Sequence, residues 1–380
     1  MNASGAGASA AGEYLCQDEG GRLLVITAGG TGGHMFPAQA LAEVMLARGW
    51  RVVLFTDERG GRYAGGFPQL VERRIVTSAT FARGGLIGKA MVLPKVLSGV
   101  LATRIQMKRD RAAAVVGFGG YTAIPAMGAA WMLNLPRIIH EQNGTMGCVN
   151  RLFAPRVDVV ACGVWPTAGA GGRAVHVGNP VREVVLERAG SGYTLPAEGP
   201  IRLLVFGGSQ GAQILADVVP AALAALPKEL RARLFLSQQA RPEDEARVKT
   251  AYAEAGIAAE IATFFADIPE RLQAAHLVIS RAGASSVADI TVIGRPSILV
   301  PYALATGDHQ TFNAKPLVEA GAARMIAQQE LTPALLSEHI TAILTKPGCA
   351  EGMAAAALAA VRPDAATALA DLVETHARGA

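Results

Sequence analysis

Residues 23–37 read LLVITAGGTGGHMFP, and residues 203–214 read LLVFGGSQGAQI. Each stretch is an apolar run that ends in a glycine-rich polar turn and continues into a helical pattern. A strand, a glycine turn and a helix in this order bring backbone N–H groups to the helix N-terminus, where they can hold an anion. Because this unit occurs twice, about 180 residues apart, we expect two nucleotide-type folds that face one cleft.

The rest of the chain repeats the same alternation of short apolar runs and longer helical patterns. The expected strands are continuously apolar, as in parallel sheets covered by helices on both faces. Repeated strand–helix alternation predicts right-handed βαβ units, doubly wound sheets and an α/β fold. The expected strands are 22–27, 51–55, 113–116, 137–139, 157–161, 202–206, 233–236, 276–280 and 297–300, and the expected helices are 36–48, 122–133, 213–226, 243–255 and 284–293.

Composition shifts indicate how the chain is divided. The stretch GYTLPAEGP at 192–200 predicts a linker before the second opening strand. Residues 1–20 are small and polar and lack the features of a signal peptide, so we expect a loose N-terminal extension. Residues 21–185 are expected to form the first Rossmann-like domain, 200–350 the second, and 351–380 a helical tail that could pack back on the first.

Bulk composition limits the classes of function. The 380 residues are 51% hydrophobic and 17% charged, as in a well-buried globular protein. Aromatic residues make up only 5%, which argues against nucleic acid as a partner. The four cysteines are widely spaced, so neither a disulfide framework nor a zinc site is expected. The uncharged run 112–136 could span a bilayer in length, but its glycines and prolines predict a strand, a turn and a buried helix.

Two common phosphate-binding fingerprints are absent. G-x-G-x-x-G would need glycine at Met35, and G-x-x-x-x-G-K-[ST] would need glycine at Arg83 and Ser or Thr at Ala90. The chain has no D-x-D carboxylate pair, so neither a protein-held metal ion nor another cofactor is expected. The residues alone leave two readings of each glycine turn: it holds an anion, or it merely lets a strand turn sharply against a helix.

Seven motifs together are more informative than any one of them. They closely resemble those of the MurG family of bacterial N-acetylglucosaminyltransferases, a family-28 group, over roughly residues 22–375. In sequence order they are GGTGGHMFP (29–37), GFGGYTAIP (117–125), HEQNGTMG (140–147), GNPVR (178–182), GGSQGA (207–212), ISRAGASSVADI (279–290) and DHQTFNA (308–314).

The resemblance implies a GT-B glycosyltransferase, in which two doubly wound Rossmann-like domains face an interdomain cleft. It implies inverting transfer of N-acetylglucosamine from UDP-N-acetylglucosamine to lipid I, giving lipid II for peptidoglycan synthesis, cell shape and cell division. It also implies a peripheral protein on the cytoplasmic face of the bacterial inner membrane, with an anionic membrane surface and other wall-synthesis proteins among its candidate partners.

The C-terminal half then supplies the donor site. Ser209 and the neighbouring amides should contact the UDP diphosphate, and Arg182 should add fixed positive charge there, unless it forms an ordinary interdomain salt bridge. Asp289 stands where the family typically carries glutamate, so a water could bridge this shorter acid to the ribose. Phe265 should offer backbone groups to uracil, and Gln310 should contact the hexose. The nucleoside is expected to be lined further by Ala284, Ser285, Ser286, Val287 and Ala288.

The N-terminal half supplies the acceptor side and the candidate base. Thr31, Gly32 and Gly33 would approach the donor sugar and the acceptor diphosphate. His34, near a helix N-terminus, should stay neutral and could take the proton from the muramyl 4-hydroxyl. The alternative is that His34 only hydrogen-bonds a diphosphate.

Three further residues match the family's site. Glu141 is the competing candidate for the base, and Tyr121 is a further member of the candidate catalytic site. Asn143 matches a position that contacts the donor. His309, beside Gln310, is expected to be a surface residue.

Residues 83–111 suggest a membrane-facing surface. They carry seven Lys or Arg against one acidic residue, Asp110, with apolar residues interspersed. Such a surface can lie on anionic headgroups, where a polyprenyl-linked acceptor would be met. An ordinary helix with one buried and one solvated face would show the same composition.

Two other functions stay open at this point. One is a different GT-B enzyme, either another transferase or a UDP-N-acetylglucosamine epimerase, which would need no lipid acceptor. The other is a non-catalytic scaffold that binds a UDP-sugar. His34 and the intact glycine turns argue against the scaffold.

Overall fold

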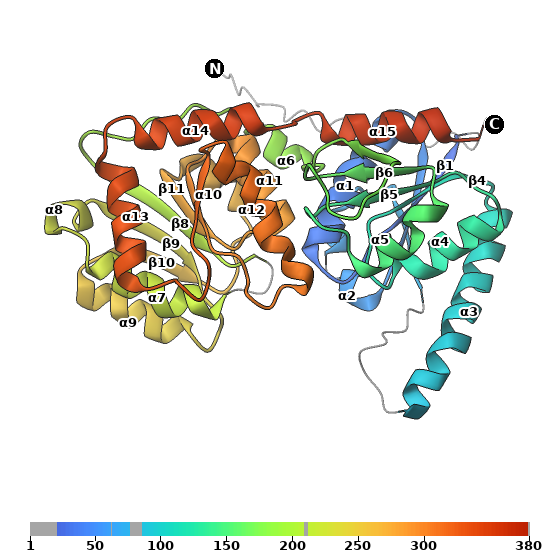
Figure 1. The fold of residues 1–380 in the computed structure, drawn as a ribbon, viewed down its shortest axis with the longest axis horizontal. Coiled ribbons are helices and arrows are strands. Elements are labelled where there is room, and N and C mark those ends of the chain that lie inside the picture. Colours follow the sequence, from blue (N-terminus) through green and yellow to red (C-terminus); the bar gives the residue numbers. More distant parts are fainter. Residues whose placement is uncertain (1–20, 62, 77–85, 209–211, 379–380) are drawn as a thin grey trace, which may run out of the picture.

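The computed structural model describes residues 21–61, 63–76, 86–208 and 212–378, with only the backbone described over 86–93. The expected N-terminal extension, 1–20, therefore lies outside the described residues. Two parallel sheets lie side by side, each covered by helices on both faces (Figure 1). This arrangement confirms the predicted α/β class with two doubly wound Rossmann-like sheets.

The first sheet has the strand order β3-β2-β1-β4-β5-β6-β7, and every pairing in it is parallel. Its strands are β1 (Leu23–Thr27), β2 (Arg51–Thr56), β3 (Glu72–Ile75), β4 (Ala112–Gly117), β5 (Arg137–Glu141), β6 (Val159–Cys162) and β7 (Ala174–His176). Its helices are α1 (Gly32–Ala47), α2 (Glu58–Gly61), α3 (Leu86–Arg109), α4 (Ala123–Met132) and α5 (Cys148–Phe153), and α6 (Glu183–Leu186) follows on the linker.

The second sheet has the order β10-β9-β8-β11-β12-β13 and is also parallel throughout. Its strands are β8 (Ile201–Phe206), β9 (Leu234–Gln239), β10 (Ala258–Ala262), β11 (Leu277–Ser280), β12 (Ser297–Leu299) and β13 (Ala323–Met325). The helices after the linker are α7 (Gln213–Ala224), α8 (Lys228–Arg231), α9 (Glu245–Ala255), α10 (Ile268–Ala274), α11 (Ala284–Ile293), α12 (His309–Glu319), α13 (Pro333–Thr345), α14 (Cys349–Ala360) and α15 (Ala365–His376).

Helix α1 begins one turn earlier than the sequence pattern predicts. The Thr31 carbonyl accepts hydrogen bonds from the N–H groups of His34 and Met35, each at 3.2 Å, so the helix starts at Gly32 rather than at 36. Pro37 therefore lies inside the helix and not in its first turn. His34 is placed in the first turn of α1 as a result.

The last helix of the chain packs on the first domain. Leu369 and Val373 of α15 lie in the same buried cluster as Leu24 of β1. Arg48 at the end of α1 pairs with Asp371 at 2.8 Å and with Glu374 at 2.7 Å. In Figure 1, α14 lies along the second domain and α15 along the first, so the chain crosses between the domains twice.

The uncharged run 112–136 folds into β4 and the buried helix α4, as its sequence predicts. In the part of the chain that the structure describes, no helix is long and apolar enough to cross a membrane.

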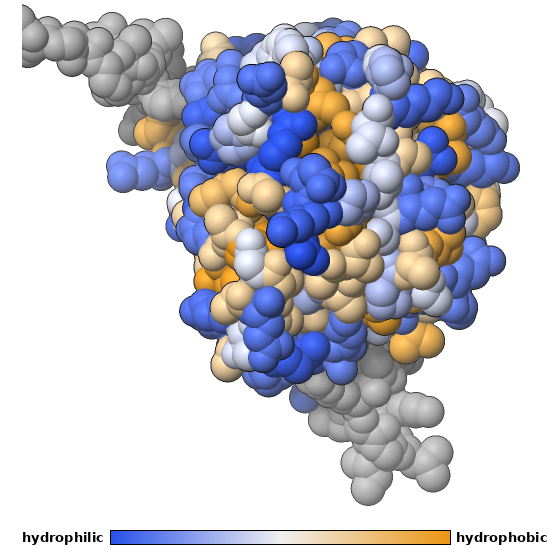
Figure 2. Space-filling model, turned by 90° about the vertical axis from the view of Figure 1, so that its left-hand side faces the viewer, coloured by the Kyte–Doolittle hydropathy of each residue, from blue (hydrophilic) through white to orange (hydrophobic). Residues whose placement is uncertain are grey.

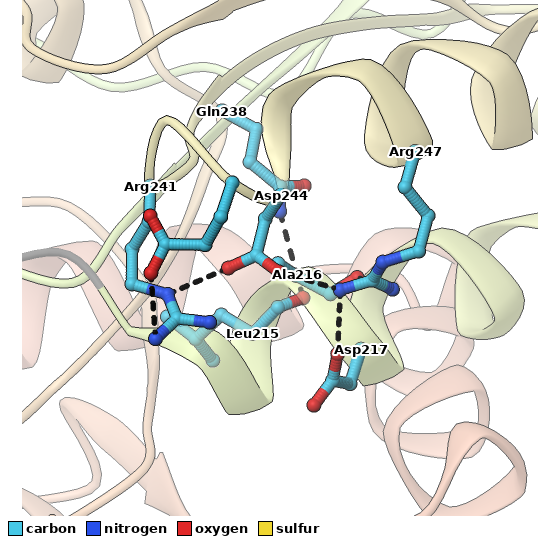
Figure 3. A network of polar contacts seen from close by, with 8 residues as sticks. Leu215, Ala216, Asp217, Gln238, Arg241, Asp244 and Arg247 are labelled. Carbon is cyan, nitrogen blue, oxygen red and sulfur yellow. Dashed lines mark hydrogen bonds and ion pairs between the residues drawn. The ribbon is translucent and has the colours of Figure 1, made fainter.

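The outer end of the second domain carries an ion-pair network. Arg247 contacts Asp217 of α7 at 2.6 Å and Asp244 at 2.9 Å, and Arg241 contacts Asp244 at 2.7 Å (Figure 3). These contacts hold the start of α9 against α7. On this side of the molecule, hydrophilic and apolar residues are interspersed (Figure 2).

Candidate active site

The first glycine turn positions His34 at the carboxyl end of the first sheet. Gly30 has φ of +85°, which favours glycine because it has no Cβ. The His34 Nδ1 atom lies 3.1 Å from the Gly29 carbonyl oxygen. A carbonyl can only accept, so Nδ1 carries the proton, and the lone pair of the neutral ring is on Nε2.

The surroundings of His34 keep its imidazole neutral. Burial is the largest influence and lowers the pKa of His34, and His309 across the cleft lowers it further. Glu141, the Gly29 carbonyl and Asp57 oppose these effects without outweighing them. At neutral pH the ring is therefore available to accept a proton.

Another glycine turn, at 119–120 after β4, packs against the first. Gly119 and Gly120 have φ of +92° and +76°. A Cβ atom added to Gly120 would lie 3.8 Å from the His34 ring, and one added to Gly29 would lie 2.5 Å from the Thr122 hydroxyl oxygen. Gly29 is thus required for close approach, whereas Gly119 and Gly120 are required for their positive φ. The partly buried Tyr121 directly follows the turn that approaches His34.

Glu141, at the end of β5, has both carboxylate oxygens occupied. Oε1 accepts from the backbone N–H and the side-chain amide of Asn143, both at 3.1 Å. Oε2 accepts from the Gly147 N–H and the Asn150 amide, both at 2.9 Å. The side chain is only 2% exposed. This carboxylate therefore fixes the loop 142–147.

Asn313, in the first turns of α12, joins the two domains at this loop. Its amide donates to the Asn143 side-chain oxygen at 3.1 Å and to the Ala282 carbonyl at 3.0 Å. Its own side-chain oxygen accepts from the Gly144 N–H at 2.9 Å. A Cβ atom on Gly144 would lie 2.8 Å from the Phe312 backbone oxygen. The cleft floor is thus a hydrogen-bonded contact between the loop after β5 and α12.

Arg182 links the domains on the other side of the cleft. Its guanidinium stacks 4.2 Å over the Phe36 ring of α1 and lies 3.7 Å from an Asp289 carboxylate oxygen of α11. Burial is the main influence on Asp289 and raises its pKa to about 6, although Arg182 opposes the shift. Within the described part of the chain, Arg182 is the one cation paired with this buried carboxylate.

The nucleotide side of the second domain is formed by α11 and two loops. Gly283 caps α11 without a side-chain hydrogen bond, so the N–H groups of the first turn, at residues 284–286, are left for another acceptor. Gly208, with φ of +78°, leads into the second glycine turn. Ser209 itself lies outside the described residues. The predicted residues 284–289 all lie on α11.

Phe265 and Gln310 complete the predicted donor residues. Phe265 is buried after β10, and the Arg271 guanidinium stacks 4.0 Å from the centre of its ring. The Gln310 side-chain oxygen accepts from the Tyr302 N–H at 3.0 Å, and its NH₂ group has no partner within the described chain. His309 lies close enough to affect the pKa of His34. It is partly buried rather than fully exposed.

The described part of the basic segment exposes an apolar stripe along α3. Leu97, Leu101 and Ile105 recur every fourth residue and are 54%, 43% and 66% exposed. Lys95 and Lys108 are exposed on the same helix, which projects from the first domain in Figure 1. Arg83 lies outside the described residues.

Sequence reasoning missed two polar side chains of this cleft, Asp57 and Asn313. Asp57 follows β2 directly, and the carboxyl ends of neighbouring parallel strands share one edge of the sheet. That rule could have identified it. Asn313 lies within the motif at 308–314, but nothing in its spacing reveals that it bonds to the other domain. No group of three His, Cys, Asp or Glu that could hold a metal ion occurs among the residues described.

Family models match both halves of the chain. Residues 24–162 match the glycosyltransferase family 28 N-terminal domain, and residues 202–370 match the glycosyltransferase family 28 C-terminal domain. The two matches leave only the ends and the linker region outside them.

Two curated relatives align with nearly the whole chain. They come from Caulobacter vibrioides (strain NA1000 / CB15N) and Paramagnetospirillum magneticum (strain ATCC 700264 / AMB-1), and they are 48% and 47% identical over 366 and 358 residues. The alignments cover 94% and 92% of this chain and 99% and 96% of the relatives. Both relatives are named UDP-N-acetylglucosamine--N-acetylmuramyl-(pentapeptide) pyrophosphoryl-undecaprenol N-acetylglucosamine transferase.

Solved structures show the same architecture. Acinetobacter baumannii MurG is 28% identical with a TM-score of 0.76, over 93% of this chain and 99% of that chain. A UDP-GlcNAc 2-epimerase from Neisseria meningitidis bound to UDP-GlcNAc has a TM-score of 0.67 over 93% and 100% of the two chains. At 10% identity, that likeness shows a common fold only.

Proposed function

The chain belongs to glycosyltransferase family 28, and we propose that it transfers N-acetylglucosamine from UDP-N-acetylglucosamine to lipid I, giving lipid II. The observation that carries this proposal is the 48% identity, over 94% of the chain, to a relative named for that reaction. The family is the one that the seven sequence motifs predict, and the chain is accordingly a glycosyltransferase.

We assign the role of general base to His34. The proton on Nδ1 is directed at the Gly29 carbonyl, so Nε2 is free to take the proton from the muramyl 4-hydroxyl. The 4-oxygen then forms a bond to the anomeric carbon as the bond from that carbon to the diphosphate oxygen breaks, and UDP leaves with the electron pair. A single displacement of this kind converts an α-linked donor into a β-linked product.

Glu141 is better suited to positioning than to proton transfer. Four donors already occupy its carboxylate, and two of them hold Asn143, which faces the second domain. A base at this position would have to give up at least one of these hydrogen bonds. Tyr121 follows the glycine turn after β4 and is proposed to contact the reacting sugars together with Thr31, Gly32 and Gly33.

The donor nucleotide is proposed to lie over α11. Asp289 is a buried carboxylate with one distant ion pair, which suits it to accept hydrogen bonds from the ribose diol. Arg182, at 3.7 Å from Asp289, is close enough to the same site to place positive charge beside the diphosphate. Backbone groups of Phe265 would bind uracil, and the unpaired amide of Gln310 would bind the hexose.

Charge on the departing diphosphate is proposed to be stabilised without a metal ion. The second glycine turn, including Ser209, the first-turn N–H groups of α11 and the Arg182 guanidinium supply donors for this purpose. The chain has no D-x-D pair that would hold a divalent ion between the phosphates.

We further propose that the enzyme docks on the cytoplasmic face of the inner membrane through α3. The exposed stripe of Leu97, Leu101 and Ile105 beside Lys95 and Lys108 supports this placement, since it pairs apolar area with positive charge. Lipid I would then be met at the surface of the bilayer.

The test is incubation with UDP-N-acetylglucosamine and a lipid I analogue, with and without a chelator. We expect a β-linked disaccharide whose formation survives chelation and is lost in His34→Ala. An α-linked product, or strict dependence on a metal ion, would contradict the mechanism. Release of free UDP and an epimerised sugar without acceptor would instead identify an epimerase.

A further inference from the structure

Asp57 is a buried carboxylate at the edge of the site. It follows β2 directly and is 7% exposed. One oxygen, Oδ1, accepts from the N–H of Gly60 at 2.8 Å and from that of Gly30 at 3.2 Å. The other oxygen, Oδ2, faces Arg59, whose guanidinium nitrogen lies 3.1 Å away.

The hydrogen bond to Gly30 connects Asp57 to His34 through one peptide group. The N–H of Gly30 and the C=O of Gly29 belong to the same peptide unit. Asp57 accepts from the N–H of this unit at 3.2 Å, and His34 Nδ1 donates to its C=O at 3.1 Å. The path therefore runs from carboxylate to peptide to imidazole with no gap.

We propose that Asp57 is a positioning residue that acts on His34 through the Gly29–Gly30 peptide group. A carboxylate bonded to the N–H polarises the peptide and makes its carbonyl a stronger acceptor. The stronger acceptor holds His34 in the tautomer with the proton on Nδ1 and stabilises the imidazolium that forms when Nε2 takes a proton. The catalytic part of this proposal rests on the proposed function of His34.

The backbone is built to allow this contact. A Cβ atom on Gly29 would lie 2.9 Å from Asp57 Oδ1, and Gly30 has φ of +85°. A Cβ atom on Gly60 would lie 3.1 Å from the Gly29 Cα atom. A side chain on Gly29 or Gly60 would crowd the carboxylate as well as neighbouring threonines, and Gly30 has a φ that favours glycine, so the contact is compatible with glycine at all three positions.

Asp57 is ionised in the relay, by which we mean the hydrogen-bonded path from Asp57 through the Gly29–Gly30 peptide group to His34. Burial alone would raise the pKa of Asp57, but the Gly60 and Gly30 amides and Arg59 outweigh it and lower the pKa. The charged and titratable groups that act on His34 are Glu141 at the end of β5, His309 at the start of α12, and Asp57. Glu141 and His309 have opposite effects on the pKa of His34, and Asp57 has a hydrogen-bonded path to its ring.

The test compares Asp57→Asn with the matched variant Glu58→Gln. The asparagine side chain keeps an oxygen that can accept from Gly30 and Gly60 but loses the charge, whereas Glu58 is exposed and lies one residue away. NMR titration of His34 should give a pKa about half a unit to one unit lower in Asp57→Asn. It should be unchanged in Glu58→Gln. This measurement does not depend on turnover.

Kinetics with UDP-N-acetylglucosamine and a lipid I analogue provide the second readout. In Asp57→Asn, kcat should fall roughly tenfold with little change in KM, and the midpoint of its pH profile should move in the acid direction. Adding the Asp57 change to His34→Ala should cause no further loss, because Asp57 acts only through His34. A thermal unfolding transition equal to that of the wild type confirms that each variant is folded.

An unchanged pKa of His34 in folded Asp57→Asn would overturn the relay, as would an equal shift in Glu58→Gln. A further loss of activity in the double variant would also overturn it. If the wild-type enzyme transferred no sugar, the proposed function would fail, while the NMR titration would still decide whether Asp57 acts on His34.

Discussion

Replacing Asp289 with asparagine should make the free enzyme more stable and the donor complex weaker. The ionised carboxylate is buried, its pKa is raised to about 6 from 3.8, and its one ion pair is 3.7 Å long. That difference in pKa corresponds to a cost of about 3 kcal/mol for ionising Asp289 in the folded state. The variant avoids this cost but also loses the Arg182 ion pair, which offsets a part of the gain. We expect Asp289→Asn to raise the free energy of unfolding by about 1–3 kcal/mol at about pH 7.5.

The sign of the pH dependence follows from the raised pKa. Below pH 3.8 Asp289 is protonated in both the folded and unfolded chains, so it does not lower the free energy of unfolding. Between about pH 4 and 6 the Asp289 carboxyl is ionised in the unfolded chain but still largely protonated in the folded one. The free energy of unfolding therefore falls as the pH rises through this range. The advantage of Asp289→Asn should therefore be full above about pH 6 and shrink toward about pH 4.

Chemical denaturation from about pH 4.5 to 8 measures this advantage, and calorimetric titration with UDP measures donor affinity. Removing a charged acceptor from the ribose should weaken UDP binding about 10- to 100-fold. Asp217→Asn is the control, since that acid is exposed in a surface ion pair and should change stability by less than about 1 kcal/mol. An advantage that stayed constant with pH, or an unchanged affinity for UDP, would refute the reasoning.

Three further variants test the other roles. Glu141→Gln should cost about 1–3 kcal/mol of stability, because its new NH₂ group faces donors, but should keep the acid limb of the pH–rate profile, moved to lower pH because Glu141 raises the pKa of His34; loss of the acid limb would make Glu141 the base. Asn313→Ala should raise KM for the donor severalfold in kinetic assays and should have little effect on the stability of either sheet. Hydrogen exchange at 143–147 should become faster, and unchanged exchange there would contradict the interdomain contact. Ile105→Glu should reduce binding to anionic vesicles severalfold while UDP affinity is kept, and equal vesicle binding would argue against α3 as the docking surface.

The sequence predicted the buried strands of both sheets and missed all four edge strands. The strands β3, β7, β10 and β13 lie at the two edges of each sheet. An edge strand need not be apolar on both faces, and β3 reads ERRI, with three of its four residues exposed. A search for continuous apolar runs therefore finds only strands that are covered on both sides.

Sequence motifs indicate those site residues whose positions depend on local backbone geometry, but not the contacts that form between distant parts of the chain. His34 and Asp289 could be proposed from the sequence because they belong to motifs, and His34 is positioned by backbone geometry that a glycine turn encodes locally. The occupied carboxylate of Glu141 could not be foreseen, because three of its donors come from loop backbone and an asparagine nine residues away. Contacts across the cleft, such as Asn143 with Asn313, join residues 170 apart and leave no local signal.

The packing of α15 on the first sheet has a consequence for biosynthesis. Leu369, Ala370 and Val373 fill the same interior as β1, so the first domain is sealed by a segment that is translated after the second domain. A ribosome-bound chain can complete the nucleotide lobe while the lobe bearing His34 still lacks part of its interior. A premature stop within α15 would accordingly damage the first domain at the far end of the molecule, and the nascent enzyme would acquire its finished cleft only after α15 has been translated.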